Sequence, residues 1–243
     1  MADSGYEDPT EVIFPIIATR NRMWKKGDSD EPPEFRGTGF LVGDGTLAVT
    51  AAHVVDTEKP LWFMIGRELG KLFSLTVLEA DFPYDLAILQ VDPEFRLGAV
   101  KPLRVETEAT YHHSLQQMMC VEYSNTVGTP EVFRIAPVIQ LGNVTRTFDA
   151  TDLVGRPAGD DAIEMSFPAP RGASGSPVIR SGPNGPVVVG VVFSNSGSEL
   201  LPIETSTSLN AANTLLVETK YMVPRALAVN AKKHLVPMLE RHQ

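Results

Sequence analysis

Gly172-Ala173-Ser174-Gly175-Ser176-Pro177 is the stretch that says most about this chain, because its glycines permit a tight turn that presents a serine hydroxyl. Two other short strings precede it: Thr50-Ala51-Ala52-His53 and Tyr84-Asp85-Leu86-Ala87-Ile88. Together the three strings supply a hydroxyl nucleophile, an imidazole base and a carboxylate that can orient the base. These are the side chains that acyl transfer requires.

The serine-bearing turn also predicts a binding site for a developing negative charge. A tight turn with glycine on both sides of Ser174 directs successive backbone N–H groups to one side. We therefore expect the N–H groups of Gly172 and Ser174 to form an oxyanion hole, in which one donor contributes about 3 kcal/mol.

The histidine and the aspartate each have a local context that suits this chemistry. His53 follows an apolar strand and two alanines, which places its imidazole at the end of a strand. Asp85 leads directly into the apolar run 86–89, where a carboxylate is costly unless a polar group meets it. A histidine N–H would meet that need. Taken alone, a surface histidine and a turn aspartate are the ordinary interpretations, and only the combination favours catalysis.

Most of the chain reads as short strands separated by turns. Gly43-Asp44-Gly45 lies between two apolar triplets and predicts a hairpin, and the alternation in Ala162–Phe167 predicts a strand with one buried face. Pro224 predicts the start of the one convincing helix, over residues 224–235. Two groups of strands and a terminal helix predict an all-β fold of two antiparallel β-barrels with a C-terminal α-helix.

The polar stretch from Glu106 to His113 is the predicted link between the barrels. The expected domains are therefore an N-terminal barrel over 1–105 with the histidine and aspartate, and a second barrel over 106–223 with the serine. Residues 224–243 are expected to form a helix packed on the barrels.

Composition restricts the classes of partner. The chain has 243 residues, 43% of them hydrophobic, and a net charge of −9, which argues against nucleic acid or an anionic membrane as the main partner. The single cysteine, Cys120, excludes an intramolecular disulfide and favours a reducing compartment. An acidic N-terminal stretch is unlike a signal peptide. We therefore expect a cytoplasmic protein.

For two other features we favour an ordinary structural interpretation over a functional one. His112-His113 has no cysteine or acid at ligand spacing, so we expect no metal site. Cys120 lies in an apparent strand after two methionines and is expected to be a buried small side chain. The predicted reaction needs no cofactor.

The three strings together resemble the signatures of trypsin-like (chymotrypsin-fold) serine peptidases, nearest to disulfide-free bacterial members. The Gly-Ser-Pro ending of the serine string is similar to the glutamyl-endopeptidase-like group. The resemblance runs from about Val12 to Leu239. It implies that an active site lies between two barrels, with His53 and Asp85 from the first and Ser174 from the second.

The resemblance also implies which residues bind substrate. The pocket walls should include Pro168 near the base, and a substrate backbone should add a strand along Phe193, Ser194 and Asn195. No acid stands near Pro168, which disfavours arginine or lysine in the pocket. Phe193 or Ser194 stands where a serine commonly supports the triad aspartate; the alignment is ambiguous by one residue.

Ala173 departs from the family pattern. Members that mature by cleavage usually have an aspartate there, which pairs with a newly freed N-terminal amine. An alanine cannot form this ion pair, so packing or a partner must order the oxyanion hole. We therefore expect activity without N-terminal cleavage.

The resulting hypothesis is a serine endopeptidase that acts on polypeptides through an acyl-enzyme formed on Ser174, with activity falling in acid as His53 takes up a proton. The main alternative is a catalytically silent or partner-gated binding module with a protease fold. An esterase is a third possibility, although the order His, Asp, Ser reverses that of α/β-hydrolases.

Overall fold

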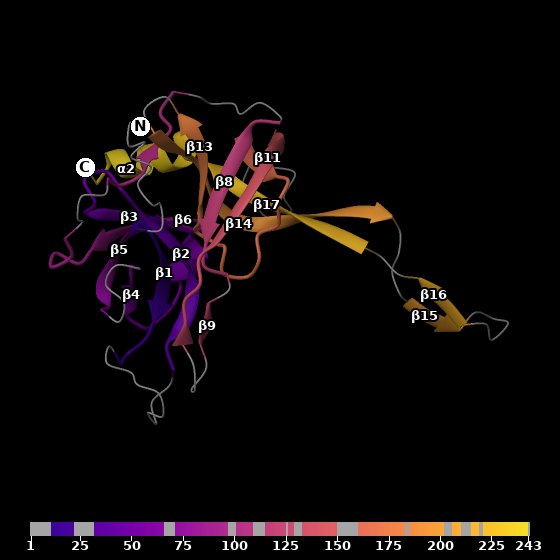
Figure 1. Cartoon of the computed structure of the whole chain (residues 1–243), viewed down its shortest axis with the longest axis horizontal. Helices are drawn as coiled ribbons and strands as arrows, with labels where there is room; N and C mark the ends of the chain where they lie inside the picture. Colours follow the sequence, from indigo (N-terminus) through magenta and orange to yellow (C-terminus); the bar gives the residue numbers. More distant parts are fainter. Residues whose placement is uncertain are drawn as a thin grey trace, which may run out of the picture.

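The computed structural model describes residues 11–21, 32–65, 71–96, 101–108, 115–124, 126–128, 133–149, 160–182, 185–201, 206–209, 215–218 and 221–242. Figure 1 shows two strand-rich bodies packed side by side and a long two-stranded arm that projects from the second body. The all-β prediction of two antiparallel barrels is confirmed.

The first body is a closed six-stranded barrel, in which every neighbouring pair of strands is antiparallel. Around the barrel the order is β1-β2-β3-β6-β5-β4. The strands are β1 (Ile13–Ala18), β2 (Glu34–Val42), β3 (Leu47–Thr50), β4 (Leu61–Phe63), β5 (Phe73–Asp81) and β6 (Leu86–Val91). The predicted hairpin at Gly43 to Gly45 joins β2 to β3, and both glycines have positive φ.

Aromatic rings fill the interior of the first barrel. Phe63 is fully buried, and its ring centroid lies 4.5 Å from that of Phe14, 5.5 Å from that of Phe73 and 5.2 Å from that of Phe95. These four rings come from β1, β4, β5 and the turn after β6, so they tie distant strands together.

The second body is also a six-stranded antiparallel barrel. Its order is β13-β8-β11-β12-β17-β14, and pairing between β13 and β14 closes it. The strands are β8 (Gln117–Glu122), β11 (Val138–Asp149), β12 (Asp160–Met165), β13 (Pro177–Gly182), β14 (Gly185–Leu201) and β17 (Tyr221–Asn230). Short two-stranded ladders β9 (Val127–Gly128) with β10 (Phe133–Arg134), and β15 (Ser206–Leu209) with β16 (Leu215–Glu218), lie outside it.

The link between the barrels is anchored to the second one. β7 (Arg104–Val105) pairs in parallel with Val187 and Val188 of β14, and the N–H of Glu106 donates to the carbonyl of Val188. The buried Glu106 carboxylate is paired with Arg180 of β13. Residues 106–108, the described part of the predicted linker, thus belong to the folded structure.

The C-terminal helix begins later than the sequence predicted. Residues Pro224 to Asn230 belong to β17, because this segment pairs with β14 on one side and, at Leu227–Val229, with β12 on the other. The helical segment is a π-helix η4 (Ala231–Leu235) that continues into α2 (Val236–Glu240). Pro237 stands in the first turn of α2, where the missing N–H of a proline costs no hydrogen bond.

Replacing Phe63 by alanine tests the importance of the aromatic core. The variant Phe63→Ala should lose about 3–5 kcal/mol of unfolding free energy, because a large cavity is left among three rings. The matched control is Phe82→Ala, whose ring is 56% exposed; it should change stability by less than about 0.5 kcal/mol. Urea unfolding followed by fluorescence measures both, and equal effects would contradict the packing argument.

Candidate active site

His53 and Asp85 form a two-point contact in the first barrel. Nδ1 of His53 lies 2.7 Å from Oδ2 of Asp85, and the backbone N–H of His53 donates to Oδ1 at 2.9 Å. The Asp85 side chain is 7% exposed, whereas that of His53 is 48% exposed. The carboxylate therefore fixes the ring through Nδ1, and no described residue forms a hydrogen bond with Nε2.

The backbone around Asp85 has an uncommon conformation. Asp85 has a φ of 56°, in the left-handed region that aspartate tolerates better than most residues. Its N–H donates to the carbonyl of Phe82, which closes a turn immediately before β6. This turn directs the carboxylate back toward His53.

Arg36 of β2 holds the short helix α1 (Ala52–Val55) that carries His53. Its guanidinium donates to the carbonyls of His53 at 3.2 Å, Val54 at 3.2 Å and Asp56 at 2.9 Å. It also pairs with Glu34 at 2.7 Å. These bonds satisfy carbonyls that the end of a four-residue helix leaves open. The sequence analysis missed Arg36, because an arginine in a charged loop looks like an ordinary solvated side chain.

The serine-bearing segment forms the tight turn that its glycines predict. Gly172 has a φ of 98° and Gly175 a φ of 85°, both in the left-handed region. Within the turn, the N–H of Ala173 donates to Pro170 and the N–H of Ser176 donates to Ala173. The N–H groups of Gly172 and Ser174 donate to no acceptor in the described part of the chain.

Thr38 of β2 joins this turn to the first barrel. Its N–H donates to the carbonyl of Ser174 at 2.9 Å, and its hydroxyl donates to the carbonyl of Gly172 at 3.0 Å. The same hydroxyl accepts a bond from the N–H of Tyr123 at 3.2 Å. Thr38 is fully buried. No sequence pattern marked it, since its role depends on a partner 134 residues away.

The approach of the two barrels is too close for a side chain at Gly175. An added Cβ would lie 2.1 Å from the carbonyl oxygen of Thr38 and 2.1 Å from Oγ1 of Thr50. On the same seam, a Cβ at Gly37 would collide with Val54 and with the carbonyl oxygen of Ser174. The turn therefore packs directly on Thr38 of β2 and on Thr50 at the end of β3.

The structure thus places all three proposed catalytic residues at the seam between the barrels. His53 and Asp85 are hydrogen-bonded to each other, and Ser174 lies on the turn bound to Thr38. No hydrogen bond joins Ser174 to His53 among the described residues. Hydrogen bonds of this kind are often long in a substrate-free site and shorten on binding.

Asn195 and Gln140 position the segment that carries Pro168. The side chain of Asn195 bonds both to the N–H of Ala169, at 2.7 Å, and to its carbonyl, at 2.5 Å. The amide of Gln140 donates to the carbonyl of Pro168 at 3.0 Å and to Glu122 at 2.6 Å. The side-chain amide of Asn195, expected at the substrate edge, is therefore occupied by the protein itself.

The two other residues expected to bind substrate differ in exposure. Phe193 is buried at 6% exposure, and Ser194 is exposed. Both follow Val192, whose N–H donates to Ser176 and whose carbonyl accepts from Gly175. This edge of β14 thus runs past the serine-bearing turn.

Apolar packing in the second barrel supports the serine-bearing turn. Ala173 is 1% exposed and belongs to the core of the second barrel with Met118, Cys120 and Val192. Burial raises the pKa of the Cys120 thiol far above its usual range, with a further rise from Glu122. Cys120 is therefore an inert core side chain and no nucleophile.

Glu122 is a buried carboxyl at the end of β8, near the serine-bearing turn. It is fully buried, and its Oε2 has no hydrogen-bond partner among the described residues. Burial raises the pKa of Glu122, and its contacts with Gln140 and Ser124 offset only part of that rise. Burial therefore shifts the equilibrium of this carboxyl toward its neutral form relative to water.

The described residues contain no group of histidine, cysteine and acidic side chains suited to a metal ion. His112 and His113 lie outside the described residues. Within the described part of the chain, no helix has the length and apolar character to cross a membrane.

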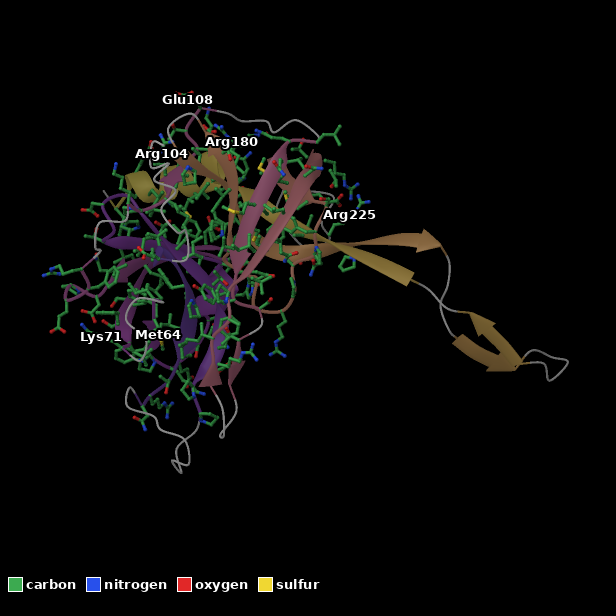
Figure 2. All side chains as sticks on the ribbon, viewed as in Figure 1. Met64, Lys71, Arg104, Glu108, Arg180 and Arg225 are labelled. Atoms are coloured by element: carbon green, nitrogen blue, oxygen red, sulfur yellow. The ribbon has the colours of Figure 1, made fainter. Side chains whose placement is uncertain are left out.

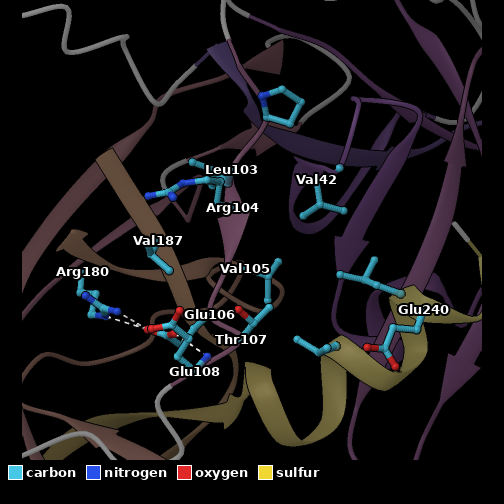
Figure 3. Close-up of a pocket in the computed structure, with 14 residues that line it drawn as sticks. Val42, Leu103, Arg104, Val105, Glu106, Thr107, Glu108, Arg180, Val187 and Glu240 are labelled. Atoms are coloured by element: carbon cyan, nitrogen blue, oxygen red, sulfur yellow. Dashed lines mark hydrogen bonds and ion pairs between the residues drawn. The ribbon is translucent and has the colours of Figure 1, made fainter. Parts of the chain in front are cut away.

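A cavity of about 500 Å³ lies elsewhere on the molecule. It is lined by the β2–β3 hairpin, the interbarrel segment from Pro102 to Glu108, and α2 (Figure 3). The ion pair of Arg180 with Glu106 lies on its wall. None of the proposed catalytic or substrate-binding residues lines it.

Comparison of the sequence with known proteins identifies one family. Residues 37–191 match the trypsin-like peptidase domain. Serine protease HTRA4 of Mus musculus is 24% identical over 153 residues, which cover 63% of this chain and 29% of the mouse protein. HTRA4 of Homo sapiens is 30% identical over 77 residues, or 30% of this chain and 16% of the human protein. The chain spans less than a third of the length of these curated relatives.

Solved structures share the fold. The HtrA-type protease AlgW with a decapeptide has a TM-score of 0.62 at 10% identity, over 95% of this chain and 64% of that one. The inactive form of Rv3671c from M. tuberculosis H37Rv has a TM-score of 0.56 at 19% identity, over 96% of this chain and 87% of that one.

Substitution of Thr38 tests the joint between the barrels. Thr38→Val keeps the shape but removes the hydroxyl, which leaves the N–H of Tyr123 and the carbonyl of Gly172 without this partner. We expect a loss of about 1–3 kcal/mol of unfolding free energy in urea. Thr38→Ser keeps the hydroxyl and is the control. If the two variants are equally stable, the hydroxyl does not hold the joint.

Substitution of Glu122 tests the buried carboxyl through pH. Because its pKa is raised in the folded protein, the folded state binds this proton more tightly than the unfolded state does. That stabilisation is complete below the ordinary value of 4.5 and is lost as pH rises through the folded pKa. Glu122→Gln, which is always neutral, should therefore gain stability relative to wild type as pH rises from 4.5 through the folded pKa, and should keep that gain at higher pH.

Melting temperatures across this pH range measure the effect. Glu94→Gln, which removes an exposed carboxylate, is the matched control. A constant difference between Glu122→Gln and wild type at all pH values would show that the carboxyl does not titrate abnormally.

Proposed function

This chain belongs to the trypsin-like peptidase family, and from that premise we propose that it is a serine endopeptidase with a catalytic triad of His53, Asp85 and Ser174. The observation that carries the proposal is the two-point contact of Asp85 with His53. It lies beside a serine-bearing turn that is bound to the same barrel through Thr38.

Each residue of the triad has a defined part in the reaction. The Ser174 hydroxyl attacks the scissile carbonyl while Nε2 of His53 takes its proton. With Nδ1 donating to Asp85, Nε2 is the nitrogen that can accept. The buried carboxylate then stabilises the imidazolium. His53 returns the proton to the leaving amine, and water releases the acyl group by the same steps.

The oxyanion hole is proposed at the N–H groups of Gly172 and Ser174. Two observations support it: neither N–H donates to a described protein acceptor, and Gly172 has the positive φ of a tight turn. Such donors cost no reorganisation when charge develops on the substrate oxygen.

We further propose that the site needs no N-terminal cleavage. The position beside Ser174 is the buried, apolar Ala173, so no freed amine is required to neutralise a charge there. Core packing and the bonds of Thr38 support the turn instead.

Polypeptide is the proposed substrate, and peptides are present in the structures of AlgW, an HtrA-type protease. Pro168, Phe193 and Ser194 are the proposed contact residues, with Asn195 positioning the segment that carries Pro168. A location in the cytoplasm stays a prediction from the sequence.

A partner-gated binding module is the second candidate. The observation that favours it is the absence, among the described residues, of a hydrogen bond between Ser174 and His53. Such a module would acquire a working triad only when a partner or substrate orders the site.

Labelling with a serine-directed fluorophosphonate separates the two candidates. Uncleaved wild-type protein should label at Ser174, while Ser174→Ala should not label, and His53→Ala should label about 100-fold more slowly or worse. Mass spectrometry locates the adduct and confirms the intact N-terminus. Labelling that appears only after a binding partner is added would favour the gated module.

A further inference from the structure

The arm that projects from the second barrel is a continuation of two barrel strands. β14 and β17 stay paired beyond the barrel, from Ser196 opposite Arg225 to Leu201 opposite Tyr221, with one register shift between Glu199 and Leu201. Figure 1 shows this ribbon extending well outside the barrel. β14 runs over 17 residues, whereas strands of globular proteins usually have five or six.

The base of the arm is firmly anchored. Arg225 stands where the ribbon leaves the barrel (Figure 2) and donates to the buried carboxylate of Glu164 on β12 at 3.1 Å. Arg146 and Thr145 of β11 bind the same carboxylate at 3.0 Å and 2.7 Å. Two cations thus compensate one buried charge and fix the direction in which the arm starts.

One edge of β14 changes partner beside the nucleophile. As far as Val191, this edge pairs with β13, and Val192 then bonds with Ser176 and Gly175 of the serine-bearing turn. From Ser194 to Leu201, the same edge has no strand partner among the described residues. The open backbone edge therefore begins beside Ser174 and continues from Ser194 to Leu201.

We propose that this arm extends the substrate-binding edge, so that the enzyme selects polypeptide segments that are extended over about eight residues on the acyl side of the scissile bond. The proposal rests on the proposed function, since Ser174 fixes where the scissile bond lies. A peptide would add a strand to β14, as edge strands commonly accept one. At about 3.3 Å per residue, the open edge is roughly 25 Å long.

The direction of the peptide follows from the ladder. β14 runs outward from the nucleophile, and an antiparallel partner running toward Ser174 makes the more stable pairing. Such a partner presents its acyl side to the arm. The sequence Ser196-Gly197-Ser198 puts small residues along the first part of this edge, where a second backbone must approach closely.

The first test measures kcat/KM for peptides with one cleavage sequence and different lengths. Extending the acyl side from three to nine residues should raise kcat/KM about tenfold, because further backbone hydrogen bonds form, and longer peptides should gain nothing more. Equal extension on the leaving-group side should have no such effect. A flat response to acyl-side length would overturn the proposal.

Two arm variants locate the effect. In the first, residues 198–223 are replaced by Asn-Gly, which joins the facing residues Gly197 and Pro224 by a two-residue turn. It should cleave short peptides as wild type does and lose the gain from length. The matched control replaces only residues 202–220 by Asn-Gly and keeps the described ribbon to Leu201 and Tyr221. It should retain the rise in kcat/KM with peptide length.

N-methylation of single peptide bonds tests whether the backbone is what binds. In a nine-residue acyl segment, methyl groups should weaken binding to the Ser174→Ala variant at every second residue, because only alternate N–H groups face β14. Fluorescence anisotropy of labelled peptides measures this binding without any turnover. Equal effects at all positions would contradict strand addition.

The outcomes also separate this proposal from the proposed function. If wild type neither labels nor hydrolyses any peptide, the endopeptidase assignment fails, while anisotropy still tests the edge. If the short-arm variant changes from a dimer to a monomer in light scattering and keeps the full dependence on peptide length, the arm joins two copies of this chain and the present proposal is wrong.

Discussion

The buried hydroxyl of Thr38 is the contact on which the candidate site depends. It donates to the turn that carries Ser174 and accepts from the strand end at Tyr123, so one side chain ties two segments of the second barrel to β2 of the first. Both bonds are buried, where an unmade bond is costly. These bonds hold the two barrels together beside Ser174, the proposed nucleophile.

This arrangement separates the work of the two barrels. The first barrel holds His53 between Arg36, which binds the carbonyls of its helix, and Asp85, which binds its ring. The second barrel carries Ser174, the proposed nucleophile, on a turn whose Ala173 packs in the apolar core of that barrel. Neither barrel contains the whole candidate site, so its geometry depends on the junction of the barrels rather than on either core.

Besides Asp85, three carboxyl groups are buried among the described residues, and their surroundings differ. Glu164 has Arg146 and Arg225, and Glu106 has Arg180, so each remains compatible with its charge. Glu122 has the neutral amide of Gln140, and burial therefore raises its pKa. The charged pairs stand at the base of the arm and at the interbarrel link, where they fix geometry. Glu122 lies instead beside the segment that carries Pro168.

The sequence by itself determined the all-β class, the paired barrels and the identity of the candidate triad, because these depend on local signals: alternating burial, glycine turns and short polar strings at strand ends. It placed the helix too early, since Pro224 permits a helix locally and only pairing with β12 and β14 makes the segment a strand. It also missed Thr38, Arg36 and the open edge of the arm. Their roles arise from partners far away in the chain, and tertiary structure alone decides which distant groups meet.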